Sequence, residues 1–360
     1  MNYGEALLGM ADRPSLAAFV RDGIGHVAVG PVRALRSFAD LDAPGRWFVV
    51  LPYDFPAVPG RAWDLAHATA CGTTNDERRT TNPQALRTTP SWSASGHLAR
   101  VRAALDSIAA GDVYELNLAC TWTIDLAPHA HPDLALHLAL LRADAAAYAC
   151  VVRGGEGPAI VGNSPELFLS VQAGVAECRP IKGTRRRVPG REAAVRAELD
   201  ASVKERAELA MIVDLMRHDL GRVAEPGGVR VADPGSVIDL PRLHHRAAHV
   251  TARLRPATPL SAVLAACFPA GSITGAPKLA AMRRIAELEG SSRGHWCGAY
   301  GTVGDGACEL AVAIRTVELD GSRLTLRAGG GIVADSDPAA EWDEARAKAQ
   351  GIAAVLGAEV

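Results

Sequence analysis

The chain has 360 residues, 48% of them hydrophobic, and a formal net charge of −2. This length allows a large core in one or two domains, and the small net charge argues against a nucleic-acid partner. The N-terminus lacks a basic start followed by a long apolar run, and no apolar stretch approaches membrane-spanning length. The seven cysteines form no CxxC pair, which indicates free thiols in a reducing compartment. We therefore expect a soluble, cytoplasmic protein without membrane contact.

The predicted elements are short at first and become clearer along the chain. The early part mixes short apolar runs with Gly and Pro, and residues 71–96 are polar and turn-rich, which indicates a linker or exposed loop. Strands that follow one another without βαβ alternation favour an α+β fold. The apolar patterns predict strands at 46–55, 113–124, 159–172, 175–181, 242–254, 295–303, 308–319 and 323–333, and helices at 96–111, 131–149, 201–223, 261–268, 276–290 and 338–356.

Two pairs of glutamates stand three residues apart in predicted helices. One pair is Glu205 and Glu208, and the other is Glu341 and Glu344. The spacing places each pair on one helix face. If the two helices converge, the carboxylates can form an oxygen site for Mg²⁺, which takes few protein carboxylates and keeps several waters. Spacing alone favours the simpler interpretation, which is solvated faces with local pairs such as Glu344 with Lys348.

Two glycine clusters and one arginine are further candidates. Residues 268–278 (FPAGSITGAPK) end near a helix start, where backbone N–H groups can hold an anion. Residues 328–336 (AGGGIVADS) would let a ligand approach bare backbone, although ordinary turns explain each cluster taken singly. Arg315, predicted within a strand, suits a bidentate carboxylate contact if it faces a cavity, and a solvent-facing position is the plainer alternative. No G-x-S-x-G nucleophile elbow is evident, and the sequence holds no HExxH or CxxC pattern.

Lys182 lies in CRPIKGTRRR, between an apolar strand and a Gly-Thr turn signal. A cation at this position is either an electrostatic anchor or a nucleophile. As a nucleophile its amine must be uncharged, and burial or a nearby cation such as Mg²⁺ would lower its pKa.

Together, these strings resemble the chorismate-utilising enzymes. That family includes anthranilate synthase component I, aminodeoxychorismate synthase component I, isochorismate synthase and salicylate synthase. The resemblance implies an α+β fold of two stacked antiparallel β-sheets with helices outside. Residues 1–90 match poorly and are expected to be a divergent part of the same sandwich, with the polar linker at about 71–96, and 97–360 to be the chorismate-binding catalytic region. The matching strings are GDVYELNLA, SPELFL, RPIKGTRRR, KERAELAMIVDLMRHDLGRV, FPAGSITGAPKLAAMRRIAELE, WCGAYG, AVAIRTV and AGGGIVADSDPAAEWDEARAKA.

The resemblance also implies a role for each matched residue. Mg²⁺, which would hold the ring carboxylate of chorismate, is expected on Glu208 and Glu344, with support from Glu205 and Glu341. The expected catalytic residues are Lys182, Glu166 as general acid, His245 near the leaving hydroxyl, and Glu115, which would position ammonia or substrate. The expected substrate-binding residues are Gly183, Thr184, Thr274, Arg315 on the enolpyruvyl carboxylate, Gly330, Gly331, and Lys348 near the metal-bound carboxylate.

Lys182 points to one branch of the family. Members that make anthranilate usually carry Ala in PIAGT, whereas the aminodeoxychorismate branch carries Lys in PIKGT. In that branch the lysine amine adds to ring carbon 2 as the hydroxyl at carbon 4 leaves. Ammonia then expels the lysine and gives 4-amino-4-deoxychorismate, which is the precursor of p-aminobenzoate. The p-aminobenzoate would in turn serve folate synthesis or a specialised metabolite. Isochorismate and salicylate synthases carry a lysine at the position of Glu115, which argues against both.

Other interpretations stay open. An anthranilate synthase-like enzyme would make 2-amino-2-deoxyisochorismate or anthranilate, and an idle chorismate-binding regulatory subunit would make neither. The sequence shows no glutaminase domain, so ammonia is expected from a separate glutamine amidotransferase subunit in a heterodimer. Three residues depart from the family pattern: Thr302 for a substrate-contacting Tyr, for which Tyr300 could compensate, His218 for Asn, and Arg246 for Leu.

Overall fold

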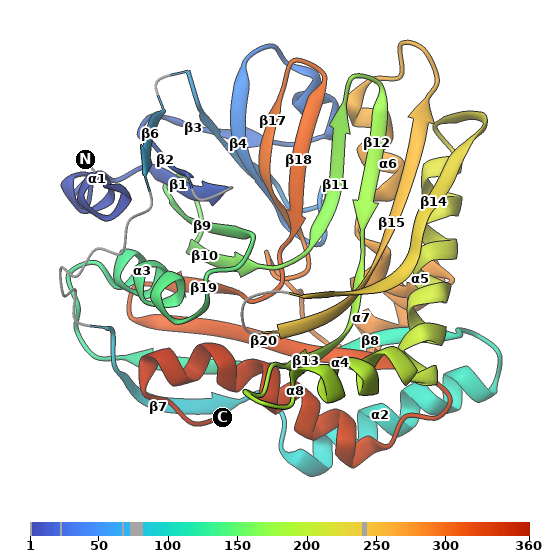
Figure 1. The fold of residues 1–360 in the computed structure, drawn as a ribbon. Helices are drawn as coiled ribbons and strands as arrows, with labels where there is room; N and C mark the ends of the chain where they lie inside the picture. Colours follow the sequence, from blue (N-terminus) through green and yellow to red (C-terminus); the bar gives the residue numbers. More distant parts are fainter. Residues whose placement is uncertain (1, 22–23, 67, 73–81, 240–242) are drawn as a thin grey trace.

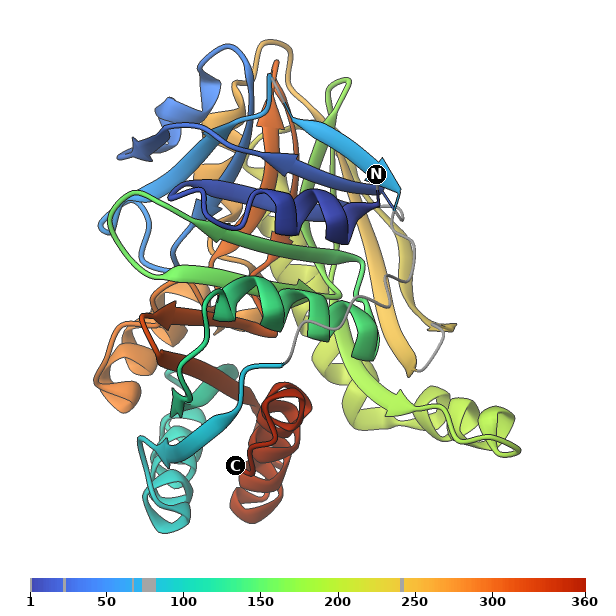
Figure 2. The same cartoon turned by 90° about the vertical axis from the view of Figure 1, so that its left-hand side faces the viewer.

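A computed structural model describes residues 2–21, 24–66, 68–72, 82–239 and 243–360. The chain forms two ten-stranded antiparallel β-sheets, and helices lie on their outer faces (Figures 1 and 2). In Figure 1 the strands of one sheet run across those of the other. The expected α+β fold of two stacked antiparallel sheets is therefore confirmed. No helix in the described ranges is long and apolar enough to cross a membrane.

The first sheet contains, in spatial order, β16 (Gly275–Ala276), β8 (Glu115–Leu126), β20 (Arg323–Ile332), β19 (Thr316–Asp320), β10 (Ala159–Ser164), β9 (Tyr148–Arg153), β1 (Leu16–Arg21), β2 (Ile24–Ala28) and β6 (Thr69–Gly72), with β7 (Ala85–Pro90) also paired to β8. The second sheet contains β13 (Ile181–Arg186), β15 (Leu243–Leu254), β12 (Val175–Arg179), β11 (Leu167–Gln172), β18 (Ala307–Val312), β17 (Ala299–Gly304), β4 (Arg46–Leu51), β5 (Gly60–Asp64) and β3 (Val32–Leu35), with β14 (Ala224–Asp239) also paired to β15.

The α-helices are α1 (Tyr3–Gly9), α2 (Ala94–Ala109), α3 (Pro132–Asp144), α4 (Glu192–Ala201), α5 (Val203–Gly221), α6 (Leu260–Cys267), α7 (Lys278–Glu289) and α8 (Pro338–Ala353). Short 3₁₀ helices are η1 (Phe38–Asp42), η2 (Gly271–Ile273) and η3 (Ala354–Leu356). Helices α2 and α8 lie side by side under β8 and β20, whereas α5 packs along β14 and β15 (Figures 1 and 2).

Several sequence predictions are corrected by the fold. The range predicted as a polar linker contains β7 and the start of α2, so a loop is wrong for these parts, and residues 73–81 lie outside the described residues. Because that interval is not described, the division into 1–90 and 97–360 stays a prediction. Each of the ranges 159–172 and 308–319 forms two strands in different sheets rather than one. Helix α4 and strand β14 were not predicted.

The chain passes from one sheet to the other at two neighbouring places. Glu166 lies between β10 and β11, and Arg315 lies between β18 and β19. Backbone hydrogen bonds join the two crossings, from Val312 N to Glu166 O (3.0 Å) and from Asn163 N to Arg315 O (3.1 Å). Both predicted site residues therefore lie where the sheets meet.

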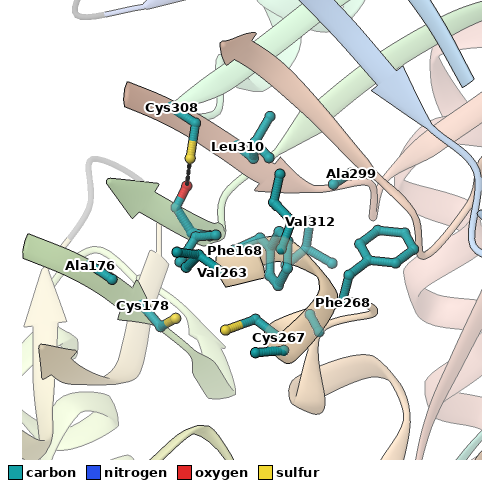
Figure 3. Packing of buried hydrophobic residues seen from close by; sticks show 14 of the residues in the cluster. Phe168, Ala176, Cys178, Val263, Cys267, Phe268, Ala299, Cys308, Leu310 and Val312 are labelled. Atoms are coloured by element: carbon teal, nitrogen blue, oxygen red, sulfur yellow. Dashed lines mark hydrogen bonds between the residues drawn. The ribbon is translucent and has the colours of Figure 1, made fainter. Parts of the chain in front are cut away.

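The three largest of the four hydrophobic clusters in the described residues lie at three different interfaces. Phe19, Phe48 and Tyr300 belong to a cluster that lies between the two sheets. A second cluster packs the first sheet against α3 and α8. The third joins the second sheet to α5 and α6, and Figure 3 shows Phe168 and Val263 in this cluster, near the thiol of Cys308, which donates a hydrogen bond to the Leu169 carbonyl (3.9 Å).

Candidate active site

A buried ion pair joins the two sheets. Lys182 on β13, in the second sheet, donates from Nζ to Oε1 of Glu115 on β8, in the first sheet, at 2.7 Å. The Glu115 side chain is 0% exposed and the Lys182 side chain only 10% exposed. Charged groups this deeply buried are rarely left without a functional or structural partner.

Two neighbouring glycines let the backbone of β20 come close to charged side chains of the site. A Cβ atom at Gly331 would lie 2.6 Å from Glu115 Oε1 and 3.0 Å from Lys182 Nζ. A Cβ atom at Gly330 would instead lie 3.1 Å from Glu341 Oε2 and 3.3 Å from Glu344 Oε1. Because successive residues of a strand face opposite sides, β20 presents bare backbone both to the ion pair and to the carboxylates of α8.

The predicted Gly-Thr turn is a bulge inside a strand. Gly183 has φ +77°, and the register of β13 against β15 shifts between Lys182 and Thr184. A bulge adds one residue to a strand and redirects the following side chains. A side chain at Gly183 would also meet Glu205 Oε2 at 2.8 Å. The glycine therefore lets β13 approach the start of α5.

The electrostatics of Lys182 differ from the expectation. Burial acts to lower the pKa of the Lys182 amine, but the carboxylates of Glu115, Glu208 and Glu166 outweigh it and raise the pKa. The prediction of a lowered pKa for Lys182 is therefore wrong, because the net shift is upward. These carboxylates favour the ammonium form of Lys182.

Glu166 has the opposite character. Its side chain is buried at the sheet crossing, where Oε1 accepts a hydrogen bond from Ser272 Oγ at 2.5 Å. Burial raises the pKa of Glu166 to about 7, although the Ser272 hydrogen bond and the Lys182 charge act to lower it. A carboxyl group with such a pKa can carry a proton near neutral pH and donate it.

His245 lies opposite Thr184 in the pairing of β13 with β15. Its Nδ1 is 2.7 Å from Thr184 Oγ1, and its Nε2 has no hydrogen-bond partner among the described residues. Burial, reinforced by the positive charge of Arg315, lowers the pKa of His245 to about 4. The imidazole is therefore neutral at pH 7 and can act by hydrogen bonding rather than by charge.

Arg315 lies in the connection between strands and not, as predicted, within a strand. Its backbone has φ +48°, and its side chain is 34% exposed. One guanidinium nitrogen is 3.7 Å from Asp144 Oδ2, at the end of α3. Much of its hydrogen-bonding capacity thus stays available to an anionic ligand.

The acidic pairs of α5 and α8 are linked by Lys204, which the sequence analysis did not single out. Its Nζ lies 3.8 Å from Glu208 Oε1 and 3.5 Å from Glu341 Oε1. Burial raises the pKa of Glu208 to about 7, against the effect of Lys182. Glu344 has a lowered pKa because Lys348, at 2.7 Å, and Lys204 outweigh its burial. One lysine thus shares its charge between both helices.

These carboxylates fit a Mg²⁺ ion by donor type. In the described part of the chain, no three His, Cys, Asp or Glu side chains are close enough to hold a metal ion together. Mg²⁺ needs only one or two protein carboxylates, since water completes its coordination shell. The ammonium group of Lys204 between Glu208 and Glu341 demonstrates that a cation is accommodated between α5 and α8.

Residues 50–354 match the family described as chorismate binding enzyme. This chain belongs to that family. Aminodeoxychorismate synthase component 1 of Klebsiella aerogenes is 44% identical over 237 residues, which are 65% of this chain and 52% of that protein. Anthranilate synthase component 1 of Streptomyces coelicolor is 41% identical over 249 residues, 68% of this chain and 48% of that protein.

The chain therefore spans about half the length of these curated relatives. The solved structure of the menaquinone-specific isochorismate synthase of Escherichia coli shares its fold, with a TM-score of 0.83 at 19% identity. That match covers 98% of this chain and 91% of the other.

Other predicted residues have local partners within the fold. Thr274 Oγ1 donates to the Ala270 carbonyl (3.0 Å), and Lys348 Nζ donates to the Gly329 carbonyl (2.9 Å). Tyr300 donates to the Tyr148 carbonyl (2.8 Å) inside the sandwich, so its hydroxyl is not free to compensate for Thr302. The substrate-binding role of Thr274 stays a prediction.

Two departures from the family pattern have different outcomes. Arg246 is buried and donates to the Leu199 and Asp200 carbonyls (3.0 and 2.8 Å), which anchors the end of α4. His218 lies exposed on α5, and nothing in the structure explains it.

Sequence reasoning missed three polar side chains beside the site. They are Lys204, Ser272 and Ser336. The Ser272 hydroxyl donates a hydrogen bond to Glu166, and the Ser336 hydroxyl donates to Glu341 Oε1 at 2.7 Å. The i, i+4 spacing of Lys204 and Glu208 was a visible signal. Ser272 comes from a segment far from Glu166 in the chain, so no local pattern connects the two, whereas Ser336 lies only five residues before Glu341.

Proposed function

We propose that this chain aminates chorismate to 4-amino-4-deoxychorismate through a covalent bond to Lys182. The single observation that supports this most is the buried Lys182 amine, which lies against the bare backbone of Gly331. The curated relative from Klebsiella aerogenes, named aminodeoxychorismate synthase component 1, supports the same branch.

The reaction has two displacements that use residues of this site. In the first, the neutral Lys182 amine bonds to ring carbon 2, the ring double bond shifts, and the carbon 4–oxygen bond breaks. Glu166 gives its proton to the departing hydroxyl, which leaves as water. In the second, ammonia bonds to carbon 4, the double bond shifts back, and the Lys182 amine leaves. The added nitrogen returns a proton to Glu166, so chorismate and ammonia become aminodeoxychorismate and water.

Substrate anchoring falls to groups around this centre. Arg315 binds the enolpyruvyl carboxylate, and Gly183, Thr184, Gly330 and Gly331 line the ring with little side-chain bulk. His245, neutral and fixed by Thr184, lies near the leaving hydroxyl. Glu208 and Glu344 would hold Mg²⁺ with the help of Glu205 and Glu341. The bound metal supplies a positive charge for the ring carboxylate of chorismate.

Ammonia comes from a separate glutamine amidotransferase subunit in a heterodimer. The support is the name of the Klebsiella aerogenes relative, aminodeoxychorismate synthase component 1, which implies a second component. Free ammonium salt should replace that subunit in a test. The product would serve p-aminobenzoate and folate synthesis or a specialised pathway in the cytoplasm.

The test incubates the chain with chorismate, Mg²⁺ and ammonium salt. The lyase that releases p-aminobenzoate is then added. We expect p-aminobenzoate from the natural chain and none from Lys182→Ala. Anthranilate as the product would instead assign the chain to the anthranilate synthase branch. The Streptomyces coelicolor relative carries the name of that branch. Chorismate binding without either product at high ammonium would indicate a regulatory subunit.

A further inference from the structure

Lys182 and Glu115 form an isolated ion pair among the described residues. Among the ion pairs of the described residues, only Glu115 approaches Lys182 Nζ within 4.0 Å, at 2.7 Å. The second oxygen of the same carboxylate, Oε2, is buried and has no hydrogen-bond partner in the described ranges. Among the described residues, the Glu115 carboxylate therefore has one hydrogen-bond partner, and that partner is the proposed nucleophile.

This contact raises a chemical problem for the proposed function. An ammonium group has no lone pair and cannot attack a ring carbon. The charged groups that face Lys182 are carboxylates on four different elements: Glu115 on β8, Glu166 at the sheet crossing, Glu208 on α5 and Glu344 on α8. All four favour the ammonium form. A proton must therefore be removed from Nζ inside the site before the bond to carbon 2 can form.

We propose that Glu115 is the base that takes this proton from Lys182 and later returns it. The inference rests on the proposed function. A proton moves from Nζ to Glu115 Oε1, and the free electron pair of Nζ then forms the bond to carbon 2. When ammonia displaces the adduct, the lysine nitrogen leaves as a neutral amine and takes the proton back from Glu115. Both groups end each cycle as they began.

Burial favours this exchange once substrate has displaced water. Passing one proton across the contact converts two buried charges into two neutral groups, and a dry site stabilises neutral groups relative to charged ones. The other carboxylates are less suited. Glu166 accepts from Ser272 and serves the leaving hydroxyl, and Glu208 shares Lys204 with Glu341. Only the Glu115 oxygen already lies at hydrogen-bond distance from Nζ.

The experiment follows the covalent step alone. Natural chain and Glu115→Gln are mixed with chorismate and Mg²⁺ without ammonia, and intact mass spectrometry records the adduct, whose mass is that of protein plus chorismate minus water. We expect Glu115→Gln to form the adduct about 100-fold more slowly near neutral pH. The deficit should shrink as pH rises toward that of a free amine, about 10, because solvent can then remove the proton. Asp125→Asn, on the same strand and paired with Arg323, is the matched control.

Each other outcome overturns the assignment. An adduct that forms as fast or faster in Glu115→Gln means that the carboxylate only holds the ammonium form. A deficit that is equal at every pH means that Glu115 positions Lys182 without taking its proton. Unfolding temperature and chorismate affinity, both expected to change little, separate these results from misfolding. Lys182→Ala isolates the proposed function, because product from that variant would refute covalent catalysis, whereas an inactive Lys182→Ala with an unaffected Glu115→Gln would refute only the base.

Discussion

At the scale of single residues, the site depends on the absence of side chains as much as on their presence. Gly331 faces the Glu115–Lys182 pair, and a Cβ atom there would fall within 3.0 Å of both charged groups. The pair cannot move away freely, because Glu115 is completely buried. The backbone at this position therefore sets where the amine lies.

Gly331→Ala should displace the amine while the fold is kept. A misplacement of about 1 Å at a reacting group can cost about 100-fold in rate, and we expect a loss of that size in adduct formation. Gly351→Ala on α8 is the control, because nothing lies within 4 Å of its added Cβ atom. Full activity of Gly331→Ala would argue against the arrangement of Lys182 described above.

Glu166 should make stability depend on pH. Its pKa rises from 4.5 to about 7 on folding, so the folded chain favours the protonated carboxyl. The neutral form carries no penalty below about pH 4.5, and ionisation costs the folded state about 3 kcal/mol once the pH is above 7. Urea unfolding of the natural chain and of Glu166→Gln across this range should diverge as pH rises, with the natural chain losing stability. Parallel curves would contradict a raised pKa.

The sequence could identify most of these residues but not their states. PIKGT and SPELF indicated Lys182 and Glu166 because the resemblance rests on contiguous strings. The raised pKa of Lys182 could not be predicted, since it comes from carboxylates on four elements that meet only in the folded chain. Arg315 was placed in a strand because its neighbours are apolar, although the chain turns there to change sheets.

At the scale of elements, helices α5 and α8 each direct a carboxylate toward the other. Glu208 and Glu341 come from different helices, and Lys204 is the cation between them. Like charges at this range repel unless a cation screens them. Lys204 therefore supplies the counter-ion between the two helices, and the proposed Mg²⁺ would be a second one.

Lys204→Gln should make the chain more responsive to Mg²⁺. The lysine is 48% exposed, so its ion pairs stabilise the folded protein by only about 1 kcal/mol or less when a chelator has removed divalent metal. Mg²⁺ should raise the unfolding temperature more in the variant than in the natural chain, because the metal then replaces a missing cation. Arg217→Gln, which removes a pair with Asp214 elsewhere on α5, serves as control. Equal responses would separate Lys204 from the metal site.

Element boundaries were predicted best where a periodic pattern stood alone. Helices α7 and α8 lie within the predicted ranges 276–290 and 338–356. Strand β14 was missed because its run contains three glycines and two prolines, which signal turns. Its pairing with β15 is interrupted by register shifts, which accommodate those residues.

At the scale of the whole molecule, the early strands complete both sheets. Strands β1, β2 and β6 extend the first sheet from β9, and β3, β4 and β5 extend the second from β17. Phe19 and Phe48 stack at 4.8 Å between the sheets. The poorly matching N-terminal part thus contributes to the shared core, although its strand order could not be read from the sequence.

A chain that begins at Ala85 should fail to fold cooperatively. It would lack six strands and expose the edges of β9 and β17, which are open to pairing with other chains. We expect aggregation or a broad thermal transition by circular dichroism, and recovery when residues 1–84 are supplied as a second fragment. A sharp transition in the short chain alone would favour an independent catalytic region at 97–360.

All seven cysteines are buried and free. A thiol reagent therefore finds no ready target on the native surface, and the rate at which it reacts reports how often the interior opens. Because the native thiols react slowly, the chain is convenient for spectroscopy. One cysteine introduced on an exposed face can carry a dye or spin label while the native cysteines remain in place.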